Sequence, residues 1–207
     1  IAIEQKTTSK NPRSTVGTIT EIYDYMRLLY SRVADAYSYN TKEKMISYSD
    51  QEVINLILKN YIDKKITILS PVIKARKGHY RELFVNIRKQ GFIKVRIDGV
   101  IKDLIPNLKL DRYKIHDIEI VIDRLIVKDN ETSLKRLKES MITAMYSGND
   151  SMILINEENN KTKYFSRNLV CPSSGISYSK PEPNSFSFNS PKGMCLDCNG
   201  LGTVNKI

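Results

Sequence analysis

The sequence predicts an α+β (mixed α/β) fold, in which helices cover a sheet domain that follows an N-terminal loop and helix. Three observations support this fold class. Apolar residues recur at helical spacing in several stretches. Residues 116–127 alternate as a strand does. Asp98-Gly99 is a strong signal for a two-residue β-hairpin. Helices and strands therefore interleave, and residues 166–207 are expected to form a small, loop-rich, zinc-ribbon-like tail.

Two capping boxes predict where the first two helices begin. The first is formed by Thr18 and Glu21, and the second by Ser49 and Glu52. Each box precedes apolar residues at three- and four-residue steps, so each helix is expected to bury one face. In the first helix this stripe is more typical of core packing than of a binding site. Its members are Ile19, Ile22, Tyr23, Met26, Leu29, Tyr30 and Val33.

Strands are predicted where β-branched residues gather or alternate with polar ones. They cover residues 66–72, 92–97, 116–127 and 152–155, and a basic loop is expected over 74–79. In the clearest strand, Ile118, Ile120 and Ile122 are expected on one face and Asp117, Glu119, Val121 and Asp123 on the other.

Composition limits the classes of function. The 207 residues are 41% hydrophobic and carry a net charge of +10, which is typical of a globular protein with anionic partners. About +6 of this charge falls in residues 71–130 and about +4 in 161–207. No apolar run approaches the roughly 18 residues of a membrane span. Without an initial Met, the chain is interpreted as a piece of a longer protein. Sparse cysteines favour the reducing cytoplasm.

No catalytic constellation is present in the sequence. There is no GxxxxGK[ST] loop, no GxSxG and no HExxH. The chain is therefore expected to be inactive as an enzyme by itself.

The three cysteines resemble an incomplete zinc module. Cys195 and Cys198 form a CxxC pair, whereas Cys171 is followed by Ser174 in a CxxS pattern. Structural zinc requires four tetrahedral ligands, and a serine hydroxyl is a poor one. Either of the two histidines is a candidate for the fourth ligand. The alternative is a former zinc module that is held together by packing alone.

Several segments resemble the UvrA family, in the order in which that family has them. They are IEQKTTSKNPRSTVGT at 3–18, TEIYDY at 20–25, RKG at 76–78, RKQGF at 88–92, RIDG at 96–99, VIDR at 121–124, FSFNSP at 186–191 and CLDCNGLG at 195–202. The resemblance implies a damage-sensing, tandem ABC-type ATPase of bacterial nucleotide excision repair. Such a protein dimerises, binds double-stranded DNA, and loads UvrB. ATP and magnesium would be bound by the full-length protein, outside this piece.

The resemblance also implies a domain organisation. Residues 1–48 would belong to the first ABC signature domain, 49–165 would be the UvrB-binding domain, and 166–207 would be a degenerate zinc module. Gln5 falls at the position of the Q-loop glutamine. UvrB would be contacted by Lys94, Arg96, Arg88 and Arg124, with Lys94 standing where Arg is usual. DNA backbone would be contacted by Lys10, Arg13, Ser14 and Thr15.

Two departures from the family pattern concern zinc. The family usually has a CPxCG turn after the first helix, and residues 36–41 hold no cysteine here. Ser174 stands at a second cysteine position. These departures leave two other hypotheses open, namely a UvrA-like ABC paralogue with a role such as drug resistance, and a stand-alone basic module that binds nucleic acid.

Overall fold

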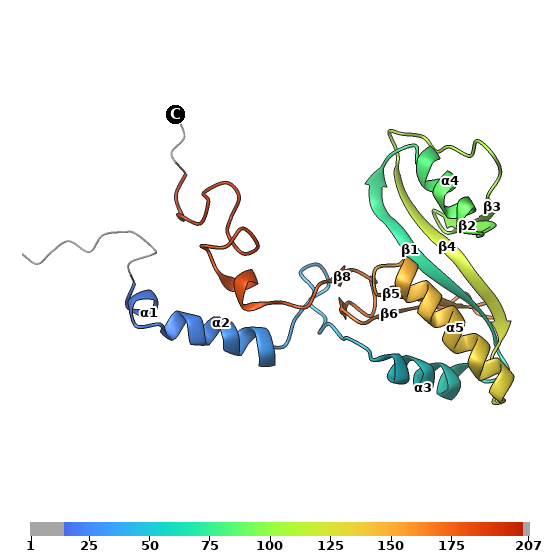
Figure 1. Cartoon of the computed structure of the whole chain (residues 1–207), viewed down its shortest axis with the longest axis horizontal. Coiled ribbons are helices and arrows are strands. Elements are labelled where there is room, and N and C mark those ends of the chain that lie inside the picture. The colour runs from blue at the N-terminus through green and yellow to red at the C-terminus, as the bar shows by residue number, and fades with distance from the viewer. Residues whose placement is uncertain (1–14, 205–207) are drawn as a thin grey trace, which may run out of the picture. The chain divides into compact units, whose positions relative to one another are not determined.

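The computed structural model describes residues 15–204 and has the predicted α+β class (Figure 1). The chain divides into two compact units. The larger one is Ala36–Tyr178, and the smaller one joins Ile1–Asp35 to Ser179–Ile207. The larger unit extends beyond the expected 49–165 at both ends, because Ile46 pairs with Val170 in an antiparallel bridge.

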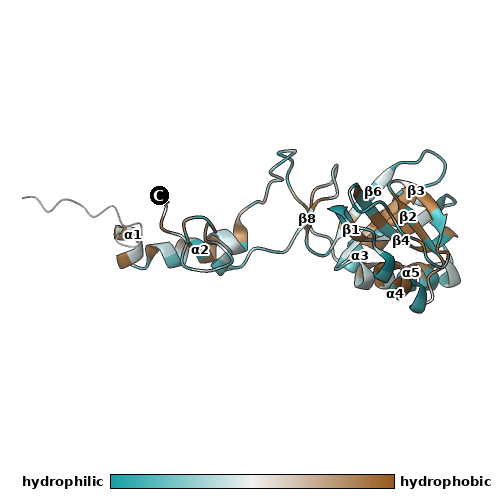
Figure 2. Cartoon of the chain, turned by 90° about the horizontal axis from the view of Figure 1, so that it is seen from above, coloured by the Kyte–Doolittle hydropathy of each residue, from teal (hydrophilic) through white to brown (hydrophobic). Residues whose placement is uncertain are grey.

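The larger unit contains a six-stranded antiparallel sheet in the order β3-β2-β4-β1-β5-β6. Three helices, α3 (Asp50–Tyr61), α4 (Arg81–Lys89) and α5 (Glu131–Ser147), lie along one face of this sheet (Figure 2). We call this face the helix side and the opposite face the open face. The strands are β1 (Lys65–Lys77), β2 (Lys94–Ile97), β3 (Val100–Asp103), β4 (Ile115–Ile126), β5 (Ser151–Asn156) and β6 (Thr162–Ser166). A separate pair consists of β7 (Leu169–Val170) and β8 (Ser177–Tyr178).

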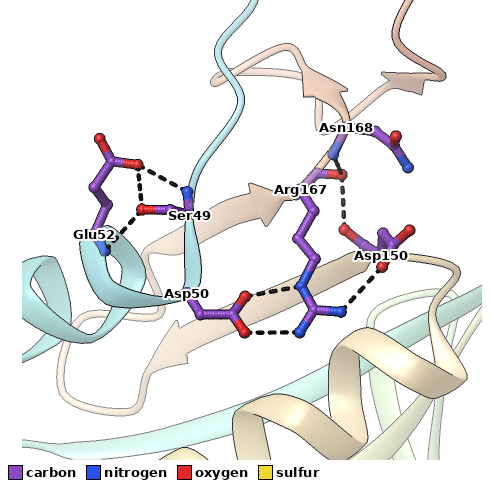
Figure 3. A network of polar contacts seen from close by, with 7 residues as sticks. Ser49, Asp50, Glu52, Asp150, Arg167 and Asn168 are labelled. Atoms are coloured by element: carbon purple, nitrogen blue, oxygen red, sulfur yellow. Dashed lines mark hydrogen bonds and ion pairs between the residues drawn. The ribbon is translucent and has the colours of Figure 1, made fainter.

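The start of α3 confirms the second predicted capping box. Ser49 Oγ accepts a hydrogen bond from the backbone N–H of Glu52, and the Glu52 carboxylate accepts one from the backbone N–H of Ser49. Arg167, which directly follows β6, also holds the start of α3 in place (Figure 3). Its guanidinium donates two hydrogen bonds of 2.8 Å to Asp50 and one of 3.1 Å to Asp150. The helix start, the α5–β5 turn and the end of β6 are thereby joined.

The core lies between the helices and the sheet in two clusters. One cluster packs α3 and α5 on β1, β4 and β5 around the buried Phe165. The other packs α4 on β2 and β4 around the buried Phe84. The hairpin between β2 and β3 turns at Asp98 and Gly99 as predicted, and both residues have positive φ (51° and 85°), as a type I′ turn requires.

The predicted basic loop at 74–79 is wrong for residues 74–77. β1 continues to Lys77, where Arg76 pairs with His116 and Lys77 with Ile115. The polar side chains of this segment are exposed. Its extended form therefore depends on backbone pairing with the neighbouring β4, which the local sequence does not reveal.

The predicted alternation of β4 is confirmed up to a β-bulge. Ile68 pairs with Asp123 and Leu69 with Val121, so Ile122 is an extra residue. Asp123 is therefore on the helix side, where it accepts hydrogen bonds from Arg136 and Ser140 of α5. The predicted placement of Asp123 on the opposite face was wrong, because the bulge shifts the strand by one residue.

The smaller unit consists of α1 (Val16–Ile19), α2 (Ile22–Val33) and the 3-10 helix η2 (Pro183–Phe186). The predicted capping box at Thr18 and Glu21 is wrong. Thr15 and Thr18 form a box at the start of α1 instead, and Glu21 adopts a left-handed conformation before α2.

The predicted burial of the first helix is also wrong. No residue of α2 is buried, and Leu29 is 56% exposed. Within its unit α2 contacts η2 through Tyr30, which is tilted against Phe186 at 6.2 Å between ring centroids. It contacts the segment just after η2 through Tyr23, which stacks on Phe188 at 5.2 Å. Two aromatic contacts cover only part of an apolar stripe that runs the length of the helix.

Candidate docking site

Three of the four residues predicted to bind UvrB lie on the open face of the sheet. In β2, Val95 and Ile97 are buried against α4, so the alternating Lys94 and Arg96 point to the other face. Beyond the bulge of β4, Arg124 lines the same hollow as Arg96. The antiparallel pairing of β2 with β4 therefore brings these cations together from distant parts of the sequence.

The carboxylate partners of the first two cations come from neighbouring strands. Lys94 Nζ lies 2.9 Å from Asp103 of β3. Arg96 donates two hydrogen bonds, of 3.1 and 2.8 Å, to Glu119 of β4, and these two side chains are only 14% and 9% exposed. This pair is forked and shielded from solvent, so both of its hydrogen bonds are charge-assisted in a site that water reaches poorly.

Glu157 is the partner of Arg124. It follows directly after β5 and accepts hydrogen bonds from Arg124 Nε at 2.7 Å and from Thr67 Oγ1 at 2.6 Å, while Lys65 Nζ lies 3.3 Å away. The Arg124 hydrogen bond, the largest influence, lowers the pKa of Glu157 to about 2, although burial opposes this shift. Nothing in the sequence near Glu157 had indicated this role.

The open face is hollowed on both sides of Arg96. The smaller hollow, of about 240 Å³, is lined by Lys74, Tyr164 and other residues. The larger one, of about 400 Å³, is lined by Arg124, Glu157 and other residues. Beneath them lies a small apolar cluster of Leu69, Val121 and Ile153, packed against Ile155 and Tyr164. The open face therefore has carboxylates and cations around two shallow hollows with an apolar floor. This arrangement suits contact with another protein surface.

Arg88, the fourth predicted contact, lies elsewhere. It belongs to α4, whose residues Phe84 and Ile87 pack on the helix side of the sheet. Arg88 therefore cannot share one flat contact surface with Lys94, Arg96 and Arg124.

The residues predicted to contact DNA or nucleotide are mostly outside the described part of the chain. Gln5, Lys10, Arg13 and Ser14 lie there. Thr15 is described, and its side chain and backbone take part in the capping box of α1.

The predicted zinc ligands divide between the two units. Cys171 is buried in the larger unit, with its sulfur 3.2 Å from Thr41 Oγ1 and 3.3 Å from a carboxylate oxygen of Glu43. Cys195 and Cys198 belong to the smaller unit. The backbone N–H of Gly202 donates to Cys198 Sγ at 3.3 Å, and this hydrogen bond lowers the pKa of the thiol.

The donors gathered by each unit do not make a complete zinc site. Across residues 15–204, no three side chains of His, Cys, Asp or Glu gather in a way that would hold a metal ion. His116, a candidate fourth ligand, has both ring nitrogens engaged, with Asp98 at 2.7 Å and the Asp111 carbonyl at 2.9 Å. Cys171 has one carboxylate beside it, that of Glu43, and otherwise the hydroxyls of Thr41 and Ser173, which are weak zinc ligands. Cys195 and Cys198 fit two positions of a tetrahedral site.

Comparison with known proteins identifies the family. A family model described as the UvrA interaction domain matches residues 49–158, more than half of the chain. The chain belongs to the UvrA family. The UvrABC system protein A of Oceanobacillus iheyensis is 44% identical over the whole chain, that of Methanothermobacter thermautotrophicus is 40% identical over the whole chain, and that of Bacillus subtilis is 42% identical over 98% of it. The chain spans only 21%, 22% and 21% of the length of these three relatives, in the same order.

The matched interaction domain contains the open-face ion pairs. Lys94, Arg96, Arg124 and Glu157 all fall within 49–158, whereas the three cysteines lie outside it. No helix within residues 15–204 is long and apolar enough to cross a membrane.

Proposed function

We propose that the larger unit docks UvrB through the open face of its sheet, as part of a cytoplasmic protein of nucleotide excision repair. The observation that carries this proposal is the placement of Lys94, Arg96 and Arg124 on one face of the matched interaction domain. A cluster of cations from two neighbouring strands suits an acidic protein surface. The names of the relatives, UvrABC system protein A, support the assignment to a multi-protein system.

The three cations have different parts in this docking. The side chains of Lys94 and Arg124 are 40% and 44% exposed, so an incoming carboxylate can reach them. Arg96 is shielded and its charge is compensated by Glu119, so it contributes shape more than positive potential or direct contact. Lys94 offers a point charge rather than the planar fork of an arginine, so its contact is expected to be weaker than that of Arg124.

Binding of the purified 207-residue chain to UvrB tests the proposal. Arg124→Gln is expected to weaken binding by about tenfold, which is about 1.4 kcal/mol. Lys94→Gln is expected to weaken it by less. Lys138→Gln is the matched control, because Lys138 is an exposed cation of α5 on the helix side. Equal losses in all three variants would reduce the effect to net charge, and no measurable UvrB binding by the wild-type chain would overturn the proposal.

For the longer protein, we propose an ATPase with bound magnesium that dimerises on double-stranded DNA. In it, Gln5 would respond to nucleotide, and Lys10, Arg13, Ser14 and Thr15 would meet the DNA backbone. Hydroxyls and an arginine fork suit phosphate oxygens. DNA binding by the full-length protein with and without Arg13→Gln tests this proposal, and an unchanged affinity would contradict it.

We also propose that Cys195 and Cys198 hold zinc. The remaining ligands would be groups other than the described side chains of the smaller unit. Thiolates are the preferred zinc ligands, and the CxxC spacing allows both to reach one ion.

A further inference from the structure

The helix side carries a second feature that the open-face docking does not use. A groove of about 410 Å³ runs between α4 and the segment that follows β3. Its floor is apolar, because Phe84 and Leu104 are 2% and 7% exposed and close its bottom. Val85 on one wall and Ile105 on the other are 45% and 59% exposed. A polar-free floor between two exposed apolar side chains is a site where water is easily displaced.

The rim of this groove is basic. Arg81, Arg88 and Lys89 line it, and none of the lining residues is acidic. In the described part of the chain, no ion pair or side-chain hydrogen bond involves any of these three cations, and the acid of α4, Glu82, does not line the groove. This contrasts with the open face, where Lys94, Arg96 and Arg124 are all paired.

The order of these residues on α4 defines what fits the groove. Arg81, Val85 and Arg88 are four and then three residues apart, so they lie on one stripe of the helix. The Cα atoms of Arg81 and Arg88 are separated by about two turns, or roughly 10 Å along the helix axis. The stripe therefore presents a cation, an apolar side chain and a second cation, beside the apolar wall of Ile105.

We infer that this groove docks an acidic segment of a partner protein, with an apolar anchor residue between two carboxylates about two helical turns apart. The apolar anchor would fill the space between Val85 and Ile105, and the carboxylates would pair with Arg81 and Arg88. Amphipathic segments bind apolar grooves in this way, and complementary charge fixes their direction. Nucleic acid fits less well, because the exposed walls are aliphatic and offer bases no aromatic surface for stacking.

The inference is tested with the 207-residue chain and a labelled helical peptide that carries leucine anchors and glutamates two turns apart. We expect saturable binding at about 50 mM salt that weakens at higher salt. A peptide with glutamine in place of every glutamate should bind at least about tenfold more weakly. The double variant Arg81→Gln/Arg88→Gln should lose a similar factor. Val85→Asn should weaken binding without changing its salt dependence, because it removes apolar contact alone.

Arg124→Gln is the matched control, since it removes an arginine of the open face. It should leave peptide binding unchanged, so failure of UvrB docking and failure of this groove can be told apart. Circular dichroism of each variant checks that the fold is intact. Equal binding of the glutamine peptide would overturn the inference, as would tighter binding of a single-stranded oligonucleotide that is lost in Arg81→Gln/Arg88→Gln.

Discussion

Glu157→Gln is the substitution that best tests how the open face is held together. The wild-type carboxylate joins Arg124, Thr67 and Lys65, and these three residues come from β4 and β1. Glutamine keeps the size of the side chain but removes its charge. The variant therefore isolates the charge-assisted part of these contacts from their packing.

The size of the effect follows from the pKa. Arg124 and its neighbours lower the pKa of Glu157 from 4.5 to about 2. One pKa unit corresponds to about 1.4 kcal/mol, so the full shift would be worth about 3 kcal/mol. Arg124 is 44% exposed, and solvent screens the pair. We therefore expect Glu157→Gln to lower the free energy of unfolding by roughly 1–2 kcal/mol at pH 7.

The pH dependence gives the sharper test. Because the pKa of Glu157 is lower in the folded chain than in the unfolded one, its contribution is present above about pH 4.5 and is lost as the pH falls through about 2. Urea unfolding of wild type and variant at pH 7, 4 and 2.5 measures this. Glu158→Gln is the matched control, since among the described residues only the backbone N–H of that exposed neighbour is hydrogen-bonded, to Asn156 Oδ1, and its carboxylate is not part of an ion pair. A deficit in Glu157→Gln that is the same at pH 7 and pH 2.5 would refute the electrostatic reasoning.

Three further perturbations test other parts of the molecule. The pKa of His116 is raised chiefly by its hydrogen bond to Asp98, so its contribution to stability is full below about pH 6.5 and declines as the pH rises through the folded-state pKa. The free energy of unfolding of His116→Asn should lack this decline, and parallel pH curves for wild type and variant would contradict the reasoning. Ser49→Ala removes the capping hydrogen bond of α3 and should cost about 1 kcal/mol in thermal or urea unfolding, while a cost near zero would show that Arg167 alone holds the helix start. Zinc content, measured by mass spectrometry of the purified chain, should fall in Cys198→Ser and stay unchanged in Cys171→Ser, and equal losses would show that both units supply ligands to one ion.

The parts of the fold that were predicted correctly depend on neighbours in sequence. The Ser49–Glu52 box and the Asp98-Gly99 turn are each defined within a few residues, so local spacing was sufficient. The family resemblance likewise rested on short segments in a fixed order. It was confirmed by the match over 49–158 and by relatives 40–44% identical over the whole chain.

The errors concern features that depend on distant residues. The bulge that moves Asp123 to the helix side arises from the register between β1 and β4, and the last residues of β1 are extended only because β4 pairs with them. The stripe of α2 has core-like spacing, but within its own unit the aromatic contacts with Phe186 and Phe188 cover only part of it. Periodicity shows that a face is apolar, and tertiary contacts decide whether it is buried.

For the candidate docking site, the sequence could indicate only a set of basic residues, because it cannot show which cations are already paired. Lys94, Arg96 and Arg124 each have a carboxylate of this chain beside them. Under the proposed docking, a partner carboxylate would replace or share an existing ion pair, so each contact would add no more than the roughly tenfold expected for Arg124, and the face would also supply orientation and specificity.

The groove beside α4 has the opposite electrostatics. Arg81, Arg88 and Lys89 keep their charge uncompensated in the described structure, so they produce a stronger field at the surface. Such a field speeds the first encounter with an acidic segment and makes it sensitive to salt. If both surfaces bind proteins, the association rate should therefore depend on the groove cations, whereas the dissociation rate should depend on the paired cations of the open face. Kinetic measurements on Arg88→Gln and Arg124→Gln with the acidic peptide and with UvrB would separate these contributions, and a change in dissociation alone for Arg88→Gln would contradict the assignment.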